Sequence, residues 1–476
     1  MSNIQQRNQN KENVLVNLPI IILGYIVNRV HDNIDRICLS LVCKRWFEER
    51  NKYLLFNTDT INLLENQNVS NRCHLKSYQY IYSKSLELKN DVTFYIGNKY
   101  FFSGKYDYYH DHLLSKEDSI QRNVSTIILD NIERMNLDFD LLKDAHIDAD
   151  LLYKMISNSN VTKLYGCRTL KSKLPDQISD LSFYHRFNEQ LTNESLPLNI
   201  KHIAMCRYYD KPIGLGVLPD GLESITFGYL YNLPIEKDTL PTSLKSLAIN
   251  SESIKLLDSL PPNLEVLILS GGVPKPIDSN FLPITIRSLQ YISVYWLPYL
   301  ANLPNLTSIL LFDILMPVVD CEFPPNLTDL VFASKYVISV PMPPLISHLN
   351  NFQLEVGPLP ASVKHLILDN FQSIIPGSIP KSLESLELLN LYRQDKEIPI
   401  GLIPDTLRSL KLEYSEEIIS SIPRTLTNII LKETEKHYEC HIRKLDHHYL
   451  MFEINKREEV IGEGEASSFS LMITEL

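Results

Sequence analysis

The sequence predicts an α+β protein with two parts: a small N-terminal module of three helices and a long solenoid whose short strands stack into a parallel β-ladder. Two observations indicate this. Thirteen prolines recur between Pro175 and Pro423 at intervals of 17 to 24 residues, and apolar residues follow most of them at fixed spacing. Near the N-terminus, by contrast, apolar residues recur at helical spacing.

We expect five segments along the 476 residues. Residues 1–13 form a polar, disordered tail. Residues 14–60 form the helical module, and residues 61–120 connect it to the solenoid. The solenoid occupies residues 121–440, and residues 441–476 cap its C-terminal end.

The helical module begins at Leu18-Pro19. Pro19 suits the first turn of a helix, where a missing N–H costs nothing, and Ile22, Leu23 and Ile26 follow it at helical spacing. A second amphipathic stretch ends at Val42, and a basic pair with an aromatic anchor at Trp46 closes the segment. Three short helices make a very small core, so we expect a partner to complete the module.

This segment resembles an F-box. The match comprises Leu18-Pro19, the apolar positions that follow, Asp35, Leu39 and the run from Val42 to Trp46. Three features depart from the pattern: Ile20-Ile21 replaces an acidic pair, Gly24 enters the first helix, and Arg36 stands at a usually apolar position.

The resemblance implies docking to a Skp-type adaptor and, through it, to a cullin-RING ubiquitin ligase. The adaptor-binding residues that it implies are Leu18, Pro19, Ile22, Leu23, Ile26, Leu39, Val42 and Trp46. The alternative is a helical cap that shields the first repeat from solvent.

The connecting region interleaves aromatic residues with lysines between residues 76 and 112. A nucleic-acid platform would combine such aromatics with excess positive charge, but five lysines here face four acidic residues. We therefore expect strands that pack between the two parts. From about residue 121, Val124, Ile127 and Leu129 already show the repeat spacing without its proline.

Each repeat of the solenoid places apolar residues after its proline, as in Pro241, Leu244, Leu247 and Ile249. The last two alternate with Ala248, which is typical of a strand that buries one face. One such strand cannot bury that face alone, so neighbouring repeats must stack. The proline precedes the strand, where its missing N–H leaves the ladder intact.

Leu-x-x-Leu-x-Leu at this period resembles the leucine-rich repeats. Residues 183–249 resemble more closely the FNIP repeat, through Phe187-Asn188, Phe227-Gly228 and Leu240-Pro241-Thr242-Ser243-Leu244. Later copies keep the proline and the ladder but lose Phe-Asn and Gly. The resemblance implies a binding solenoid with no chemistry of its own.

The alternate strand positions should form the open face of the solenoid. Early repeats fill them with small or polar residues such as Ser182 and Thr226, and the middle repeats turn apolar. An exposed apolar patch usually marks an interaction site. The substrate-binding residues predicted on this basis are Ile268, Ile292, Leu310, Phe312, Val331, Phe352 and Ile367, with His348 and His365 at the rim. The alternative is that the chain's own linker or termini cover the patch.

Composition excludes several function classes. The net charge of −11 argues against a nucleic-acid partner, and no arginine cluster is expected on the open face. The longest apolar run, residues 18–27, is far below the ~20 residues that span a bilayer, so we expect no membrane partner. Seven scattered cysteines are typical of reduced thiols in the cytoplasm or nucleus.

The sequence shows no catalytic motif, and its 15 glycines provide few phosphate-cradling turns. A group of ligand-type residues near the C-terminus lacks a second ligand pair, so we expect no metal site and no cofactor. The group comprises His437, Cys440, His441, His447 and His448.

Three function classes remain open. The first is a non-catalytic substrate-recognition subunit of a cullin-RING ubiquitin ligase that binds an unidentified protein substrate. The second is a repeat scaffold or regulatory binder without a ligase role. The third, ranked last, is a metal-dependent enzyme that uses the C-terminal histidines.

Overall fold

The structure is a computed structural model. It describes residues 16–30, 33–57, 76–88, 92–97, 108–111, 120, 122–129, 148–254, 257, 259–270, 281–313, 318–333, 337–338, 340–350, 359–369, 379–389, 403–413, 426–433, 438–444, 449–457 and 467–475.

The N-terminal module contains α2 (Ile20–Val27), α3 (Asn33–Ser40) and α4 (Lys44–Tyr53) in the segment where the sequence predicts helices. A 3-10 turn, η4 (Lys76–Tyr78), leads into a further helix, α5 (Gln79–Glu87). The helices share one hydrophobic core, made of Leu23, Val27, Ile37, Trp46, Tyr53, Leu54, Phe56, Tyr78 and Ile81. Because Tyr78 and Ile81 belong to this core, residues 76–87 extend the helical module instead of serving as a linker.

Arg36 on α3 is buried in this module. Its Nε donates to the carbonyl of Val30 at 2.7 Å, and one terminal nitrogen donates to the carbonyl of Leu55 at 2.6 Å. The guanidinium therefore ties the chain that leaves α2 to the chain that leaves α4, and it replaces apolar packing with hydrogen bonds to backbone.

The solenoid is a sheet of parallel strands, each paired with the next repeat. In spatial order the strands are β2 (Tyr108–Asp111), β1 (Val92–Gly97), β3 (Val124–Leu129), β4 (Lys163–Cys167), β5 (Asp180–Phe183), β6 (His202–Ala204), β7 (Ser224–Thr226), β8 (Ser246–Asn250), β9 (Val266–Ser270), β10 (Ser288–Ile292), β11 (Ser308–Leu311), β13 (Asp329–Phe332), β15 (His348–Asn350), β16 (His365–Asp369), β17 (Ser385–Leu389), β18 (Ser409–Glu413) and β19 (Asn428–Glu433). The predicted parallel ladder is confirmed.

The sheet continues beyond the repeats at both ends. β1 and β2 come from the region expected to connect the two parts, and they pair in parallel on the N-terminal side of β3. At the other end, β20 (Tyr438–Lys444), β21 (Tyr449–Arg457) and β22 (Ser467–Glu475) follow β19 in antiparallel order. The sheet therefore changes from parallel to antiparallel close to the boundary where the sequence predicts a cap.

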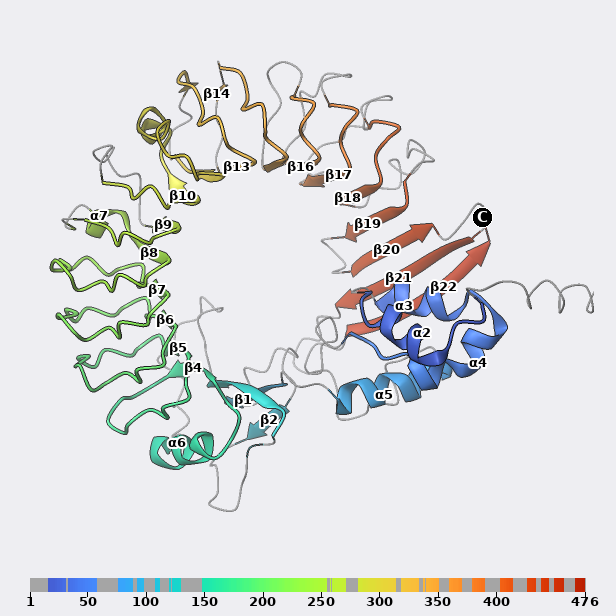
Figure 1. Ribbon diagram of the computed structural model, residues 1–476, viewed down its shortest axis with the longest axis horizontal. Coiled ribbons are helices and arrows are strands. Elements are labelled where there is room, and N and C mark those ends of the chain that lie inside the picture. Colours follow the sequence, from blue (N-terminus) through green and yellow to red (C-terminus); the bar gives the residue numbers. More distant parts are fainter. Residues whose placement is uncertain are drawn as a thin grey trace, which may run out of the picture.

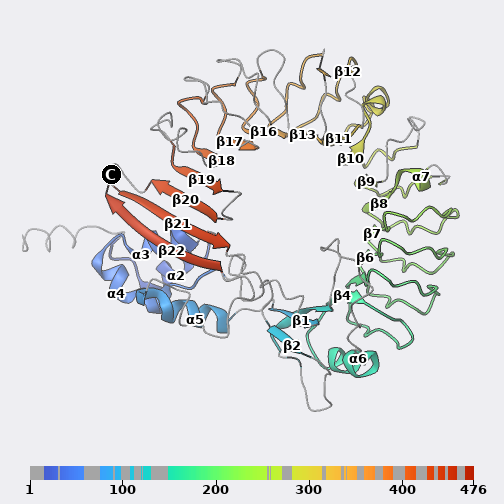
Figure 2. The ribbon, with the colours of Figure 1, turned by 180° about the vertical axis from the view of Figure 1, so that it is seen from behind.

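The repeats curve into an arc with the strands along its inner side, as Figure 1 shows from one side and Figure 2 from behind. Shorter elements lie between strands: α6 (Ala149–Ser157), α7 (Ser251–Ile254), η8 (Val294–Tyr299), and a small separate sheet of β12 (Val318–Val319) and β14 (Val337–Ile338). Both views place α2–α5 where the arc ends in β20–β22. None of the described helices is both long and apolar enough to cross a membrane.

The prolines act as the sequence predicts. In most of the described repeats the proline carbonyl accepts a hydrogen bond from the N–H three residues later, for example Leu244 N to Pro241 O at 3.1 Å. That turn delivers Leu244, Leu247 and Ile249 into the core, where each is at most 1% exposed. One core of stacked side chains runs from Val124 to Leu426 and is separate from the core of the helical module.

Polar side chains tie each turn to the preceding repeat. Asn263 Nδ2 donates to the carbonyl of Thr242 at 2.9 Å, and Asn305 and Asn326 make equivalent bonds to Ile284 and Pro304 at 2.9 and 3.0 Å. These bonds satisfy carbonyls at the repeat boundaries that no strand pairs. They fix the stacking register of the solenoid and therefore the position of its open face.

Candidate interaction surfaces

The helical module exposes large apolar side chains. On α2, Ile21 is 84% exposed, and Ile22, Tyr25 and Ile26 are also exposed. These positions lie one and four residues apart, so they form one face of the helix. Leu41 and Val42, between α3 and α4, are exposed as well. We call these six residues the exposed apolar residues of the helical module.

The eight predicted adaptor-binding residues divide into three groups. Pro19, Ile22, Ile26 and Val42 are exposed, and Leu18 and Leu39 are half-buried. Leu23 and Trp46 are only 2% and 8% exposed. The expectation that these two residues offer a contact surface is wrong, because the inner face of α2 packs against α4.

The side chains of Arg45 and Trp46 hold the segment before α2 in place. Arg45 donates to the carbonyls of Val16 and Leu18 at 2.9 and 3.1 Å, and Trp46 Nε1 donates to Val16 at 3.2 Å. The basic-aromatic run at the start of α4 therefore positions the Leu18-Pro19 entry to α2. Sequence reasoning missed Ile21 and Tyr25, although an eight-residue helix that is apolar on every side indicates an unburied face.

On the open face of the solenoid, strand register aligns Ala248, Ile268, Gln290, Leu310 and Val331 in one row. Ile268, Leu310 and Val331 are half-buried on this face, and so is Ile367 further along. Gln290 interrupts the apolar row between Ile268 and Leu310. The patch is therefore less continuous than the sequence predicts.

The prediction that Ile292 faces outward is wrong. A register shift between Gln290 and Ile292 pairs Ile292 with Leu311 and buries it at 0% exposure. The shift occurs because Tyr291 adopts a left-handed backbone conformation with φ 59° and occupies the extra position of a bulge. Tyr291 is exposed instead and meets the half-buried Phe312 edge to face, with ring centroids 6.2 Å apart. Phe352 lies outside the described residues.

The two histidines expected at the rim stack on each other. The rings of His348 and His365 lie 4.4 Å apart with planes 9° apart, and His348 Nδ1 is 3.2 Å from Asp329 Oδ1. Burial and the neighbouring His348 lower the pKa of His365 below its ordinary value. This pair borders the apolar row next to Val331.

In the part of the chain that the structure describes, no three His, Cys, Asp or Glu side chains gather as metal ligands. His437, His447 and His448 lie outside the described residues. Cys440 and His441 lie on β20, of which only the backbone is described. The expectation that these residues form no metal site therefore stays a prediction.

Comparison with known proteins identifies the repeats. Residues 209–252 and 351–390 match the FNIP Repeat family. The first match falls mostly within the segment where Phe-Asn and Leu-Pro motifs predict such repeats. The second shows that FNIP repeats also occur where Phe-Asn and Gly have been lost, so the expectation of only general leucine-rich spacing in the later copies is corrected.

A solved structure described as CroV588, a novel circular LRR protein, is similar to the chain at 19% identity with a TM-score of 0.41. The similarity covers 65% of this chain and 49% of that one, so the chain spans about half the length of the solved protein. No curated protein matches the chain.

Proposed function

We propose that this protein is a non-catalytic substrate receptor of a cullin-RING ubiquitin ligase in the cytoplasm or nucleus. The helical module docks a Skp-type adaptor, and the solenoid binds a protein substrate on its open face. The protein makes and breaks no bond and uses no cofactor. It works by holding a substrate at a fixed distance from the transfer centre, which raises the effective concentration of the reacting groups.

The exposed apolar residues of the helical module carry this proposal. Ile21, Ile22, Tyr25 and Ile26 form an exposed apolar patch that is large for so small a module. Burial of such side chains lowers the free energy, so we expect the surface of another protein to cover them. A docking helix or groove of an adaptor would supply that surface. The resemblance to the F-box names the class of adaptor.

The architecture also supports a receptor. The helical module and the solenoid have separate hydrophobic cores, so each can bind a partner without rearranging the other. The solenoid presents a long row of side chains on a sheet whose register is fixed by backbone hydrogen bonds. Such preorganised surfaces lose little conformational entropy when they bind.

Adaptor docking is tested by co-purification of the full chain with a Skp-type adaptor. Ile22→Glu combined with Ile26→Glu places charge on the exposed face of α2 and should abolish co-purification. Tyr80→Glu is the matched control, because Tyr80 on α5 is 61% exposed and lies outside the predicted docking residues. Adaptor binding that survives the double substitution would contradict docking through this face.

Substrate binding is tested by native purification with proteasome activity blocked. Replacing Ile268, Leu310 and Phe312 by serine should remove captured partners while adaptor binding persists. Thr226→Ser serves as a control on the small-residue part of the same face. If the captured partners are unchanged in the triple variant, the apolar row is not the substrate site.

The second candidate is a repeat scaffold without a ligase role. Ile20 and Ile21 favour it, because they replace the acidic pair usual in the F-box and Ile21 is almost fully exposed. Under this function a partner other than a Skp-type adaptor covers the exposed apolar residues. Co-purification that recovers such a partner and no adaptor would decide for the scaffold.

A further inference from the structure

Basic and aromatic side chains gather beyond the C-terminal ends of β5, β6 and β7. Arg186 follows β5, Arg207 and Tyr208 follow β6, and Tyr229 follows β7, and all four are exposed. The cluster lies at the edge of the sheet, at positions that the repeat pattern does not specify. We call these four residues the basic-aromatic edge.

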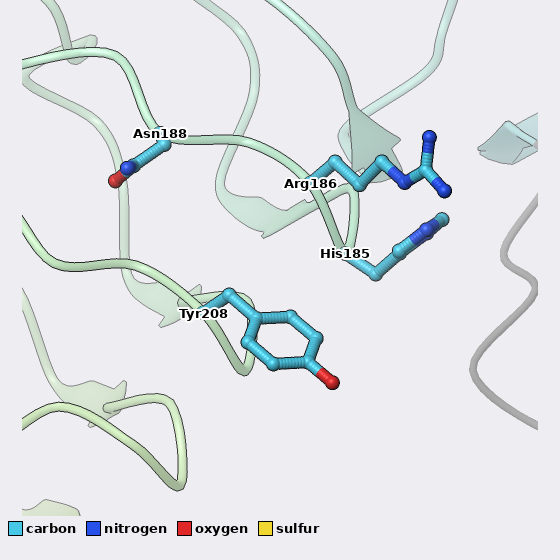
Figure 3. Close-up of a pocket in the computed structure, with 4 residues that line it drawn as sticks. All are labelled: His185, Arg186, Asn188 and Tyr208. Carbon is cyan, nitrogen blue, oxygen red and sulfur yellow. The ribbon is translucent and has the colours of Figure 1, made fainter.

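Figure 3 shows a pocket at this edge, lined by His185, Arg186, Asn188 and Tyr208. Its volume is about 430 Å³. The side chains of His185, Arg186 and Tyr208 point to the same side, whereas Asn188 turns the other way (Figure 3). Asn188 instead donates from Nδ2 to Asp210 Oδ1 at 2.8 Å. A guanidinium, an imidazole and a phenol hydroxyl thus converge on one small space.

Arg207 is held by aromatic rings from two neighbouring repeats. Its guanidinium carbon lies 5.7 Å from the ring centroid of Tyr208 and 5.5 Å from that of Tyr229. Two repeats earlier, the guanidinium carbon of Arg168 lies 4.6 Å from the ring centroid of Tyr184. Stacking on aromatic rings restricts the Arg207 side chain, and its N–H groups lie in the plane of the guanidinium, away from the ring faces.

The carboxylates of this region are already engaged. Asp210 pairs with Lys211 at 3.0 Å, and its hydrogen bond from Asn188 holds the pKa of the carboxyl below its ordinary value. Glu189 accepts from Thr169 Oγ1 and from the N–H of Leu170 at 2.7 and 2.8 Å. Among the described residues, no carboxylate forms an ion pair with Arg186 or Arg207.

The opposite edge of the same sheet shows the contrast. There, Glu223 lies between Lys201 and Lys245 at 3.3 and 2.8 Å, and Arg287 pairs with Glu265 at 3.2 Å. Charges along that edge alternate in sign from repeat to repeat, and each of these basic side chains lies within 3.3 Å of a carboxylate. In a chain of net charge −11, the basic-aromatic edge thus brings together Arg186 and Arg207 from adjacent repeats with no ion pair to a carboxylate among the described residues.

We propose that the basic-aromatic edge binds the phosphoryl group of a phosphorylated peptide. Arginine presents paired N–H donors that match phosphate oxygens, and a phosphoserine supplies a compact dianion with strong acceptors. Adjacent strands lie ~4.8 Å apart, so arginines from neighbouring repeats can reach one such group. The Tyr208 hydroxyl and the His185 ring complete the lining, and Tyr229 offers an apolar surface to the residues that flank the phosphate.

The limited extent of the edge favours a phosphopeptide over RNA. A single-stranded polyanion is bound along a groove of continuing positive charge. Here the residues directly after β7, Phe227 to Asn232, and those of α7, which follows β8, include no lysine or arginine, so the positive charge ends after the repeat of β6. The site is independent of adaptor docking and of the apolar row on the open face.

The test measures direct binding by the purified full chain. The probes are a degenerate peptide library with one fixed phosphoserine, the same library with serine, and a single-stranded oligouridylate. Arg186→Gln combined with Arg207→Gln removes the two exposed arginines. Arg287→Gln combined with Arg408→Gln makes the same change of charge on the opposite edge, and thermal unfolding verifies that both double variants fold.

We expect the wild-type chain to retain the phosphoserine library and to prefer it at least about tenfold over the serine library. The edge variant should lose that preference and the control variant should keep it. Equal binding of both libraries, tighter binding of the oligouridylate, or equal loss in the two double variants would each overturn the proposal. None of these readouts involves the adaptor, so failure here leaves the test of adaptor docking unaffected.

Discussion

The phenol rings of Tyr209 and Tyr231 stack on neighbouring repeats, with centroids 6.3 Å apart and planes 11° apart. Phe187 continues the stack one repeat earlier at 6.1 Å from Tyr209. These are the positions at which the FNIP pattern carries its phenylalanine. The stack joins successive repeats on the side away from the open face, so the motif that identifies the repeats also holds them together.

Truncation of this stack should destabilise the solenoid. Tyr209 is fully buried, so Tyr209→Ala should lower the free energy of unfolding by about 3–5 kcal/mol in urea denaturation. Tyr209→Phe should cost almost nothing, because the hydroxyl lies near the backbone of Leu191 but outside hydrogen-bond geometry. A large loss in the phenylalanine variant would show that the hydroxyl, and not the ring, holds the repeats.

The same residue should make the solenoid sensitive to alkali. Burial raises the pKa of Tyr209 from its ordinary value of 10.0 to about 12. Below pH 10 the phenol is neutral in both the folded and the unfolded chain and does not reduce stability; as the pH rises toward 12 the unfolded chain ionises first, so the free energy of unfolding falls. The free energy of unfolding, measured as a function of pH, should decline less steeply above pH 10 in Tyr209→Phe than in the wild type. Identical slopes would contradict the assignment.

Gly228 should tolerate no side chain. A Cβ at this position would lie 2.0 Å from the carbonyl oxygen of Cys206, a backbone atom that cannot turn away. Gly228→Ala should therefore lower the free energy of unfolding by at least about 1–3 kcal/mol. At Gly214 the nearest contact is a Val217 methyl at 3.9 Å, so Gly214→Ala is the control and should stay within about 0.5 kcal/mol of wild type.

The bulge at β10 predicts opposite effects for two nearby residues. Ile292 is fully buried opposite Leu311, so Ile292→Ala should cost about 2–5 kcal/mol of unfolding free energy. Gln290 lies on the open face, so Gln290→Ala should change stability by less than about 0.5 kcal/mol. If the alanine at position 290 were the more costly change, Gln290 and not Ile292 would face the core.

The sequence predicts the repeats well because their cause is local. A proline, three apolar positions and a two-residue alternation determine which side chains each strand buries, as Leu244, Leu247 and Ile249 show. The error at Ile292 has an equally local cause: Tyr291 adds one residue to its strand, and no glycine or asparagine marks the left-handed turn.

The surfaces are harder to predict, because they depend on contacts between distant segments. Burial of Leu23 and Trp46 follows from the packing of α2 against α4 and from the link between Trp46 and Val16. The basic-aromatic edge depends on Arg186 and Arg207 lying in adjacent repeats, 21 residues apart in the chain, with their neighbouring acids engaged elsewhere. Counting from the prolines locates the strands but does not reveal this pairing.

The stacked histidines should make the middle repeats sensitive to acid. His365 faces His348, Lys364, Glu384 and Asp329, and its pKa lies below the ordinary 6.5 because of burial and the neighbouring His348. A depressed pKa contributes stability that is present above pH 6.5 and is lost as the pH falls through the folded-state value, since the unfolded chain takes up the proton first. In urea unfolding, the free energy of unfolding of the wild type should therefore fall, as the pH drops below 6.5, by more than that of His365→Asn. His202→Asn, at the equivalent position on β6, serves as the control and should keep the wild-type dependence. A wild-type dependence in His365→Asn would show that another group causes the acid sensitivity.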